Sequence, residues 1–178
     1  TDQAKIDGWP NNKYLNIWVV NTFDASHNGA AAYAYTPQSA NGIPYYDGVI
    51  SLASYLNTDN TISHEVGHSL NLSHVWGNTN NAGVGCGDDN VDDTPPTKGH
   101  NPVGCVPAAL YDVTCATNYI RNGIDYPDTV NAQNVMDYTY CSKMFTQLQM
   151  ARCRTALSAA TAGRNNLWSA ANLSATGI

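Results

Sequence analysis

The sequence predicts an α+β fold in a single domain, from the order and the character of its segments. Three segments with the features of strands come first, a helical segment follows, and a second helical segment lies near the end. Between the two helical segments, residues 77–134 show no sustained periodicity and are dense in Gly, Asn, Asp and Pro. A chain of 178 residues is long enough to bury a core and matches one domain, with room for two lobes.

The first predicted strand, YLNIWVVNTF at residues 14–23, alternates and is rich in β-branched and aromatic side chains. The second is AAAYAYT at 30–36 and the third is GVISLASYL at 48–56, with Pro, Asn and Gly in the gaps. A helix is predicted from about Thr61 to Leu72, with Thr61 or Ser63 able to cap its start.

The second helix is predicted over residues 146–161, where TQLQMARCRTALSAAT offers an apolar stripe that includes Leu148, Ala151 and Leu157. The irregular segment before it holds three of the five cysteines. Such a long loop region inside a compact domain is usually functional or held by cross-links.

The composition favours a secreted protein that binds cations. The formal net charge is −6 and only 12% of the residues are charged, which argues against a nucleic-acid partner. Five cysteines indicate an oxidising compartment, with two disulfides and one thiol left over. No apolar stretch is long enough to span a membrane, and no signal peptide opens the chain, so a mature fragment of a longer precursor is expected.

Three histidines and a glutamate lie within eleven residues in HEVGHSLNLSH. His64 and His68 are four apart, so on a helix they share one face about one turn apart. His74 would lie roughly 240° from His68 on a continued helix, so the helix must stop between them and the chain must turn back. Asn71 lies in that gap, and Asn tolerates the left-handed conformation that ends helices.

This spacing predicts a catalytic zinc site with His64, His68 and His74 as its three ligands, and with Glu65 as the general base of the HExxH pattern. The bland alternatives are inert surface histidines, or a structural zinc site. A structural site would normally be closed by four Cys or His ligands, and the segment contains no cysteine.

The segment CGDDNVDDTPPT at residues 86–97 contains four aspartates. No Lys or Arg lies between Ile62 and Thr97 to neutralise their charge. Hard oxygen ligands at this density favour calcium over zinc. The alternative is a solvated acidic loop that holds no ion.

The sequence resembles the metzincin metalloproteases: HEVGHSLNLSH is similar to their HExxHxxGxxH signature, and NVMDYTY at residues 134–140 is similar to their Met-turn. Within that group it is most similar to the pappalysin family, in particular its ulilysin-like bacterial branch. The blocks YLNIWV, HEVGHSLNLSHVWG, DDTPPT and NVMDY…C…MFT occur in matching order. The resemblance covers about residues 9–155.

The resemblance implies a metzincin-like domain with a twisted, mostly parallel sheet, an active-site helix, an irregular lower lobe and a C-terminal helix. The upper lobe would be residues 1–74 and the lower lobe residues 75–178. Met136 would form an apolar floor beneath the metal. Tyr138 would stabilise the oxyanion, with a role as a core aromatic as the alternative. GVISLAS would be the edge strand that holds an extended substrate by main-chain pairing.

The family pattern also implies two disulfides, Cys86–Cys115 and Cys105–Cys141. Cys153 is left out because it lies mid-helix, where a buried thiol acts as a small apolar residue. The relatives bind calcium in the segment that matches the acidic loop. At least one calcium is therefore expected there, with Asp89, Asp92 and Thr94 as the main contributors and backbone oxygens completing the shell.

The sequence departs from the family pattern in three places. Asn71 replaces the signature's Gly, which the left-handed conformation tolerates. The family's opening strand and backing helix are expected to be absent, because only thirteen residues precede Tyr14. Only Thr139 and Tyr140 separate Tyr138 from the next cysteine, so the relatives' preference for basic residues does not carry over.

The sequence therefore predicts a secreted, extracellular zinc endopeptidase that acts on peptides or proteins. A monomer is expected, with no nucleic-acid or membrane partner and with a removed prosegment upstream. The rival readings are a non-enzymatic binding module that keeps the metal as a scaffold, and a zinc hydrolase that acts on something other than peptides.

Overall fold

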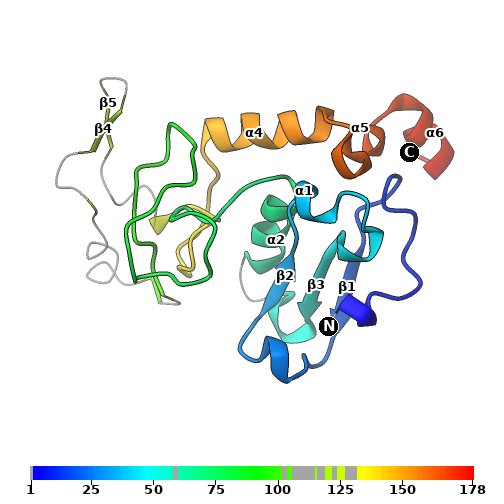
Figure 1. Ribbon diagram of the computed structural model, residues 1–178, viewed down its shortest axis with the longest axis horizontal. Helices are drawn as coiled ribbons and strands as arrows, with labels where there is room; N and C mark the ends of the chain where they lie inside the picture. The colour runs from blue at the N-terminus through cyan, green and yellow to red at the C-terminus, as the bar shows by residue number, and fades with distance from the viewer. Residues whose placement is uncertain are drawn as a thin grey trace. The chain divides into compact units, whose positions relative to one another are not determined.

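The computed structural model describes residues 2–57, 60–101, 104–105, 115, 119–121, 124–126 and 132–178. The chain forms two compact units. The first unit contains residues 1–71 and 152–178, and the second contains residues 72–151. Figure 1 shows the elements of both units in chain order.

The first unit is built on a mixed sheet of three strands. They are β1 (Ile17–Val20), β2 (Ala32–Ala34) and β3 (Val49–Leu52), in the order β1-β3-β2. The β1 strand pairs with β3 in parallel, whereas β2 pairs with β3 antiparallel. Each of the three predicted strand segments therefore contains a strand, although each strand is shorter than its segment.

The prediction that GVISLAS forms an edge strand is wrong. Its residues form β3, the central strand, whose Val49, Ile50 and Ser51 are completely buried. Three successive apolar or small residues suit a strand that is covered on both sides. The outer strand that contacts helix α2 is β2.

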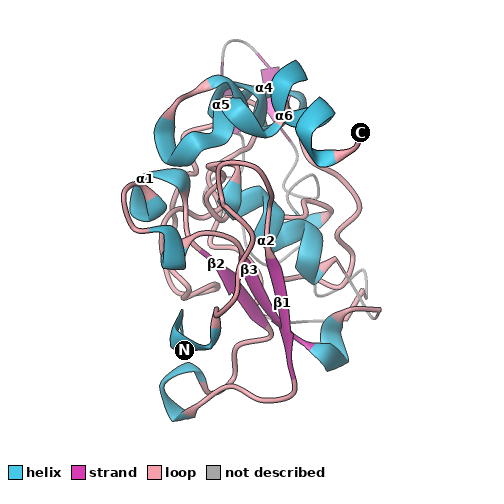
Figure 2. Cartoon of the chain, turned by 90° about the vertical axis from the view of Figure 1, so that its right-hand side faces the viewer, coloured by secondary structure: helices cyan, strands magenta, loops and turns pink. Residues whose placement is uncertain are grey.

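Helix α2 (Thr61–Ser69) carries the first two histidines and lies against β2 and β3 (Figures 1 and 2). It begins with Asn60 at the N-cap, not with Thr61 or Ser63. The helix ends at Ser69, three residues before the predicted Leu72, and Leu70 is its C-cap. The predicted break at Asn71 is present, because this residue adopts a positive φ of 73°.

Several short elements complete the first unit. The α-helices are α1 (Pro37–Ala40), the C-terminal half of α4 (Gln147–Ser158), α5 (Arg164–Leu167) and α6 (Ala170–Thr176). The 3₁₀ turns are η1 (Asp2–Ala4), η2 (Ala25–His27), η3 (Pro44–Tyr46), η4 (Ala53–Tyr55) and η6 (Thr161–Gly163). Among the described residues before β1, η1 is the only helix or strand. The sequence predicted α4 but neither α5 nor α6.

Residues 152–178 group with the first unit, whereas the sequence-based division at residue 74 assigned them to the lower lobe. A buried ion pair holds them there: Arg164 Nη2 lies 2.6 Å from Asp47 Oδ1. Arg164 Nε also donates to Ser69 O at 3.1 Å, and Asn172 Nδ2 donates to Lys13 O at 3.0 Å. These contacts join positions 95 to 159 residues apart, which local sequence patterns do not reveal.

The second unit has little regular structure in its described residues. Strands β4 (Tyr119–Arg121) and β5 (Ile124–Tyr126) pair antiparallel in this unit. They lie in a segment where the sequence predicted no element. Two disulfides, Cys86–Cys115 and Cys105–Cys141, cross-link the unit. Cys153, which belongs to the first unit, is a buried free cysteine. The pairs are those that the family resemblance implied.

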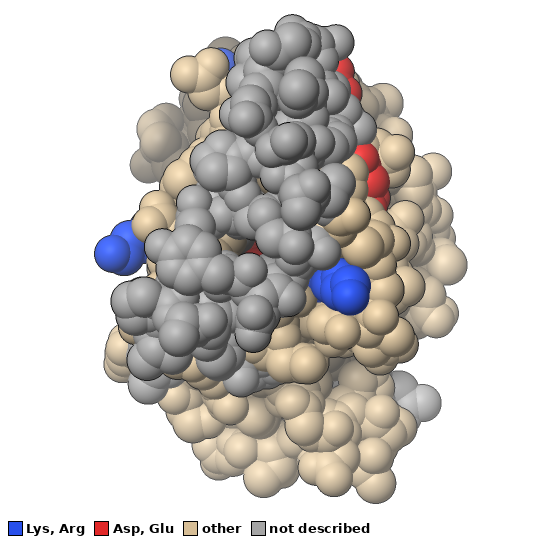
Figure 3. Space-filling model, turned by 90° about the vertical axis from the view of Figure 1, so that its left-hand side faces the viewer, with Lys and Arg blue, Asp and Glu red and all other residues tan. Residues whose placement is uncertain are grey.

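None of the described helices combines the length and the apolar character needed to cross a membrane. On the face drawn in Figure 3, the described side chains are mostly uncharged, with scattered Lys or Arg and a few Asp or Glu. This agrees with the low share of charged residues in the sequence.

Candidate metal centre

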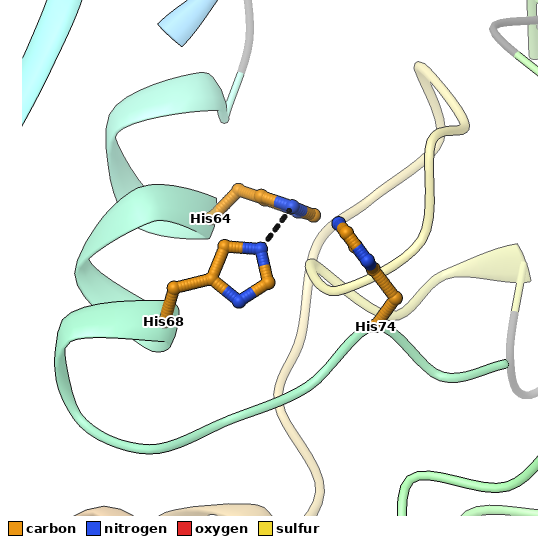
Figure 4. A group of neighbouring side chains, drawn as sticks. All are labelled: His64, His68 and His74. Atoms are coloured by element: carbon orange, nitrogen blue, oxygen red, sulfur yellow. Dashed lines mark hydrogen bonds between the residues drawn. The ribbon is translucent and has the colours of Figure 1, made fainter. Parts of the chain in front are cut away.

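The three predicted histidines come together. One ligand atom from each of His64, His68 and His74 lies within 4.8 Å of the others, and Figure 4 shows the rings of His64 and His68 on α2 facing the ring of His74. The two Nε2 atoms of His64 and His68 are 3.1 Å apart. Nitrogens bound to one tetrahedral zinc at 2.0–2.1 Å would lie about 3.3 Å apart, so this spacing fits a shared zinc ion.

The environment of His74 fixes its ring. Nδ1 lies 2.8 Å from the carbonyl oxygen of Thr79, which can only accept, so Nδ1 donates and the neutral ring presents Nε2 as a ligand. Trp76 stacks on the His74 ring with centroids 4.5 Å apart and planes 1° apart. Trp76 Nε1 donates to the same carbonyl at 2.9 Å. Such outer contacts orient a metal ligand before any ion arrives.

Glu65 is buried on α2 beside His64, with 7% of its surface exposed. Burial raises the pKa of its carboxyl to about 8, and a hydrogen bond with the backbone of Ala34 in β2 opposes this rise. A carboxyl with a pKa near neutrality can both accept and return a proton. Its position and pKa suit the role of general base.

The Met-turn segment lies next to the chain that follows His74. Met136 is completely buried, and its carbonyl oxygen accepts a hydrogen bond from the Val75 amide at 3.2 Å. Tyr138 places its ring edge-on to His74, with centroids 4.9 Å apart. The tyrosine ring therefore lies beside one of the candidate ligands.

The aspartates of the acidic loop have different hydrogen-bond partners. Asp89 is buried, and its carboxylate accepts hydrogen bonds from the Thr94 hydroxyl and, at 3.3 Å, from Gln149 Nε2. Burial raises the pKa of Asp89 to about 6. Asp93 instead accepts from Leu148 N at the start of α4, at 2.9 Å.

The calcium prediction remains a prediction, although some of the named oxygens lie close together. Asp89 Oδ1, the Thr94 hydroxyl and the Val91 carbonyl form a small group of oxygens, since the hydroxyl is 2.8 Å from that carbonyl. Asp92 is exposed on the surface. In the described part of the chain, the three histidines are the one group of three or more His, Cys, Asp or Glu side chains with converging ligand atoms.

A family model described as pregnancy-associated plasma protein-A, of peptidase family M43, matches residues 1–158. The chain belongs to the M43 peptidases, the pappalysins. No curated protein sequence matches it. The resemblance to pappalysins and the α+β metzincin fold predicted from the sequence are therefore confirmed.

Solved structures of mirolysin share the fold of this pappalysin chain. Mature mirolysin of Tannerella forsythia with a cleaved peptide is 31% identical, with a TM-score of 0.72 over 96% of this chain and 64% of that one. Mirolysin with compound 9 is 31% identical, with a TM-score of 0.66 over 90% and 58%. A promirolysin mutant is 30% identical, with a TM-score of 0.66 over 90% and 51%. The chain thus spans less than two thirds of the mirolysin chains.

Several residues that shape the pappalysin site were not singled out in the sequence. Trp76 covers the His74 ring, and Ala34 contacts Glu65 from another element. Asp137, inside the Met-turn, accepts from the backbone amide of His100 at 2.9 Å and lies 2.6 Å from its Nδ1. Trp76 follows the signature by two residues and Asp137 adjoins Met136, so proximity to a motif was a usable signal for both. No local signal points to Ala34.

Proposed function

We propose that the chain is the catalytic part of a secreted zinc endopeptidase. The observation that carries the proposal is the convergence of His64, His68 and His74 next to a buried glutamate, in a chain of the M43 family. The three imidazoles would hold the zinc. When bound, zinc acts as a Lewis acid that polarises a carbonyl and lowers the pKa of water.

The chain's own groups would move the protons. Glu65 takes a proton from the attacking water and passes it to the leaving amine nitrogen, for which a pKa near neutrality is well matched. Tyr138, held beside His74, would donate its hydroxyl hydrogen to the carbonyl oxygen as negative charge develops on it. Met136 would provide the apolar floor.

The substrate would be an extended peptide. Since β3 is central, the strand available for main-chain pairing is the outer strand β2, which contacts the helix that carries Glu65. Mirolysin has been solved with a cleaved peptide, which supports a peptide substrate for this relative as well.

The test is cleavage of a peptide library with and without a zinc chelator. The wild-type protein should cleave, the chelated protein should not, and Glu65→Ala should keep its zinc while losing nearly all turnover. Tyr138→Phe should lower kcat roughly 10- to 100-fold, the loss of one oxyanion donor, with less effect on KM. Full activity of Glu65→Ala would contradict the mechanism. Zinc-loaded protein that cleaves no peptide would favour a non-enzymatic binding module or a hydrolase of other substrates.

We further propose that the acidic loop binds calcium through Asp89, Thr94 and backbone oxygen atoms, with Asp92 approaching from the surface. The buried Asp89 carboxyl supports this, because a cation would offset the cost of ionising it there. Secretion is supported by the two disulfides, and a removable prosegment by the existence of a promirolysin. We also propose that the protein is a monomer and has no nucleic-acid partner.

A further inference from the structure

The N-terminal segment is anchored to the sheet by one ion pair. Lys5 Nζ lies 3.3 Å from Asp2 Oδ1 and donates to the carbonyl of Tyr46 at 3.2 Å. The Lys5 side chain is fully buried, and its ammonium lies 5.3 Å from the ring centroids of both Tyr33 and Tyr35. Burial lowers the pKa of Lys5 and the neighbouring Asp2 raises it, so the two side chains depend on each other.

The carboxylate of Asp2 also holds two tyrosines. The Tyr33 hydroxyl donates to one of its oxygens at 3.3 Å, and the Tyr35 hydroxyl donates to the other at 3.0 Å. Tyr33 lies in β2 and Tyr35 follows that strand directly, so both side chains point to one face of the strand. A single carboxylate therefore fixes both ends of a three-residue stretch of backbone.

The residue between the two tyrosines is Ala34, which is hydrogen-bonded through its backbone to Glu65. Leu52 N donates to Ala31 O at 2.9 Å. The backbone N–H and C=O groups of the odd-numbered residues in this stretch therefore point toward β3, and those of the even-numbered residues point away from it. The amide of Ala34 consequently points away from β3, toward α2. This amide is therefore a direct hydrogen-bond partner of the Glu65 carboxylate.

We propose that Asp2 is a positioning residue for Glu65, acting through the hydroxyls of Tyr33 and Tyr35 and the amide of Ala34. This inference rests on the proposed function, in which Glu65 moves the protons. We call the two hydrogen bonds from Tyr33 and Tyr35 to Asp2 the clamp. Without the clamp the zinc ligands keep their contacts, but β2 can shift relative to the Glu65 carboxylate. A small misplacement of a catalytic group costs rate, whereas substrate binding through other contacts persists.

The experiment compares zinc-loaded Asp2→Asn and Tyr35→Phe with two matched controls. Tyr45→Phe removes a hydroxyl from an exposed tyrosine beside the same cluster, and Asp7→Asn neutralises an exposed aspartate in the same segment. Turnover is expressed per zinc-loaded molecule, so that loss of folded protein does not count. We expect Asp2→Asn and Tyr35→Phe each to lower kcat roughly 10-fold with KM within about twofold, and both controls to match the wild type.

Two further measurements separate positioning from general stability. The double variant Asp2→Asn/Tyr35→Phe should be no slower than the slower single variant, because both remove the same interaction. Amide hydrogen exchange at Ala34 should accelerate in both single variants and in neither control. If the wild type cleaves peptides but kcat is unchanged in both variants, the inference is wrong and the proposed function stands. If no peptide is cleaved, the proposed function fails, and unchanged exchange at Ala34 would overturn the clamp independently.

Discussion

Trp76 determines how firmly His74 presents its ligand nitrogen. The indole stacks on the imidazole and shares its hydrogen-bond acceptor, Thr79 O. The space behind the indole is limited by Gly99, where an added Cβ would come within 2.0 Å of the Trp76 ring. The glycine therefore supports the metal centre without touching a ligand.

Gly99→Ala should weaken zinc binding about 10- to 100-fold, the range typical of losing an outer contact to a metal ligand. The collision is with the body of a rigid ring, so Trp76 must move and His74 loses its stacking partner. Zinc affinity measured by competition with a chromophoric chelator checks this. Gly99 has a φ of +68°, so Gly29→Ala is the matched control: its φ is +91°, but nothing lies within 4 Å. Equal affinities for the two variants would refute the argument.

Cys153 should react slowly with thiol reagents in the folded protein. Burial raises its pKa from 9.0 to about 11, which lowers the reactive thiolate roughly 100-fold at pH 8. Iodoacetamide labelling at pH 8 should be slow in buffer and fast in denaturant, with one thiol labelled per chain. Between pH 9 and pH 11 the thiol stays protonated in the folded protein but loses its proton in the unfolded chain. The contribution of Cys153 to the free energy of unfolding therefore falls as the pH rises from about 9 to about 11. Rapid labelling of native protein would show that the thiol is accessible.

The position of helix α2 depends on contacts beyond the helix itself. Arg164 donates to the carbonyl of Ser69 in its last turn and forms a buried pair with Asp47. Asp47 in turn accepts from the amide of Gly48, just before β3. One arginine thus links the end of the histidine helix to the central strand of the sheet.

Arg164→Ala should lower the free energy of unfolding by about 3–5 kcal/mol, because it leaves the Asp47 carboxylate buried without its partner. Urea unfolding at constant zinc checks this. Arg154→Ala, at an exposed position on α4, is the control and should cost less than about 0.5 kcal/mol. Adding Asp47→Asn to Arg164→Ala should recover part of the loss. A loss no larger than that of the control would mean that the pair does not stabilise the fold.

The second unit has to be stable with few helices and strands among its described residues. Its two disulfides join residues 29 and 36 positions apart, and loops of this size gain about 3–4 kcal/mol each in the entropic account. Asp93 contributes as well, since it ties the acidic loop to the start of α4 through Thr146 and Leu148. The buried Asp89 acts against stability unless it is protonated or neutralised by a cation.

Calcium should therefore raise the melting temperature of the protein. Thermal unfolding is followed with zinc kept saturating while free calcium is varied, and activity is expected to change only as the structure loosens. Asp89→Asn should remove most of the calcium response, whereas Asp7→Asn should leave it intact. A melting temperature that ignores calcium, together with no calcium in a metal analysis of the purified protein, would contradict the proposal.

The sequence alone determined the local parts of this protein. The spacing of His64, His68 and His74 required a helix break, and Asn71 supplies it with a positive φ. Strand and helix segments followed from periodicity because each depends on neighbours a few residues away. The M43 motifs and the cysteine pairs followed from the resemblance to the family.

Only the tertiary structure decided which distant residues meet. Strand order made β3 central and β2 the outer strand, against the sequence-based expectation, because register and pairing depend on the whole sheet. The same is true of the Arg164–Asp47 pair and of the clamp that Asp2 forms around Ala34. The HExxH motif was enough to identify Glu65 as the candidate base. Its raised pKa depends on burial, which is a property of the packed chain and not of the motif.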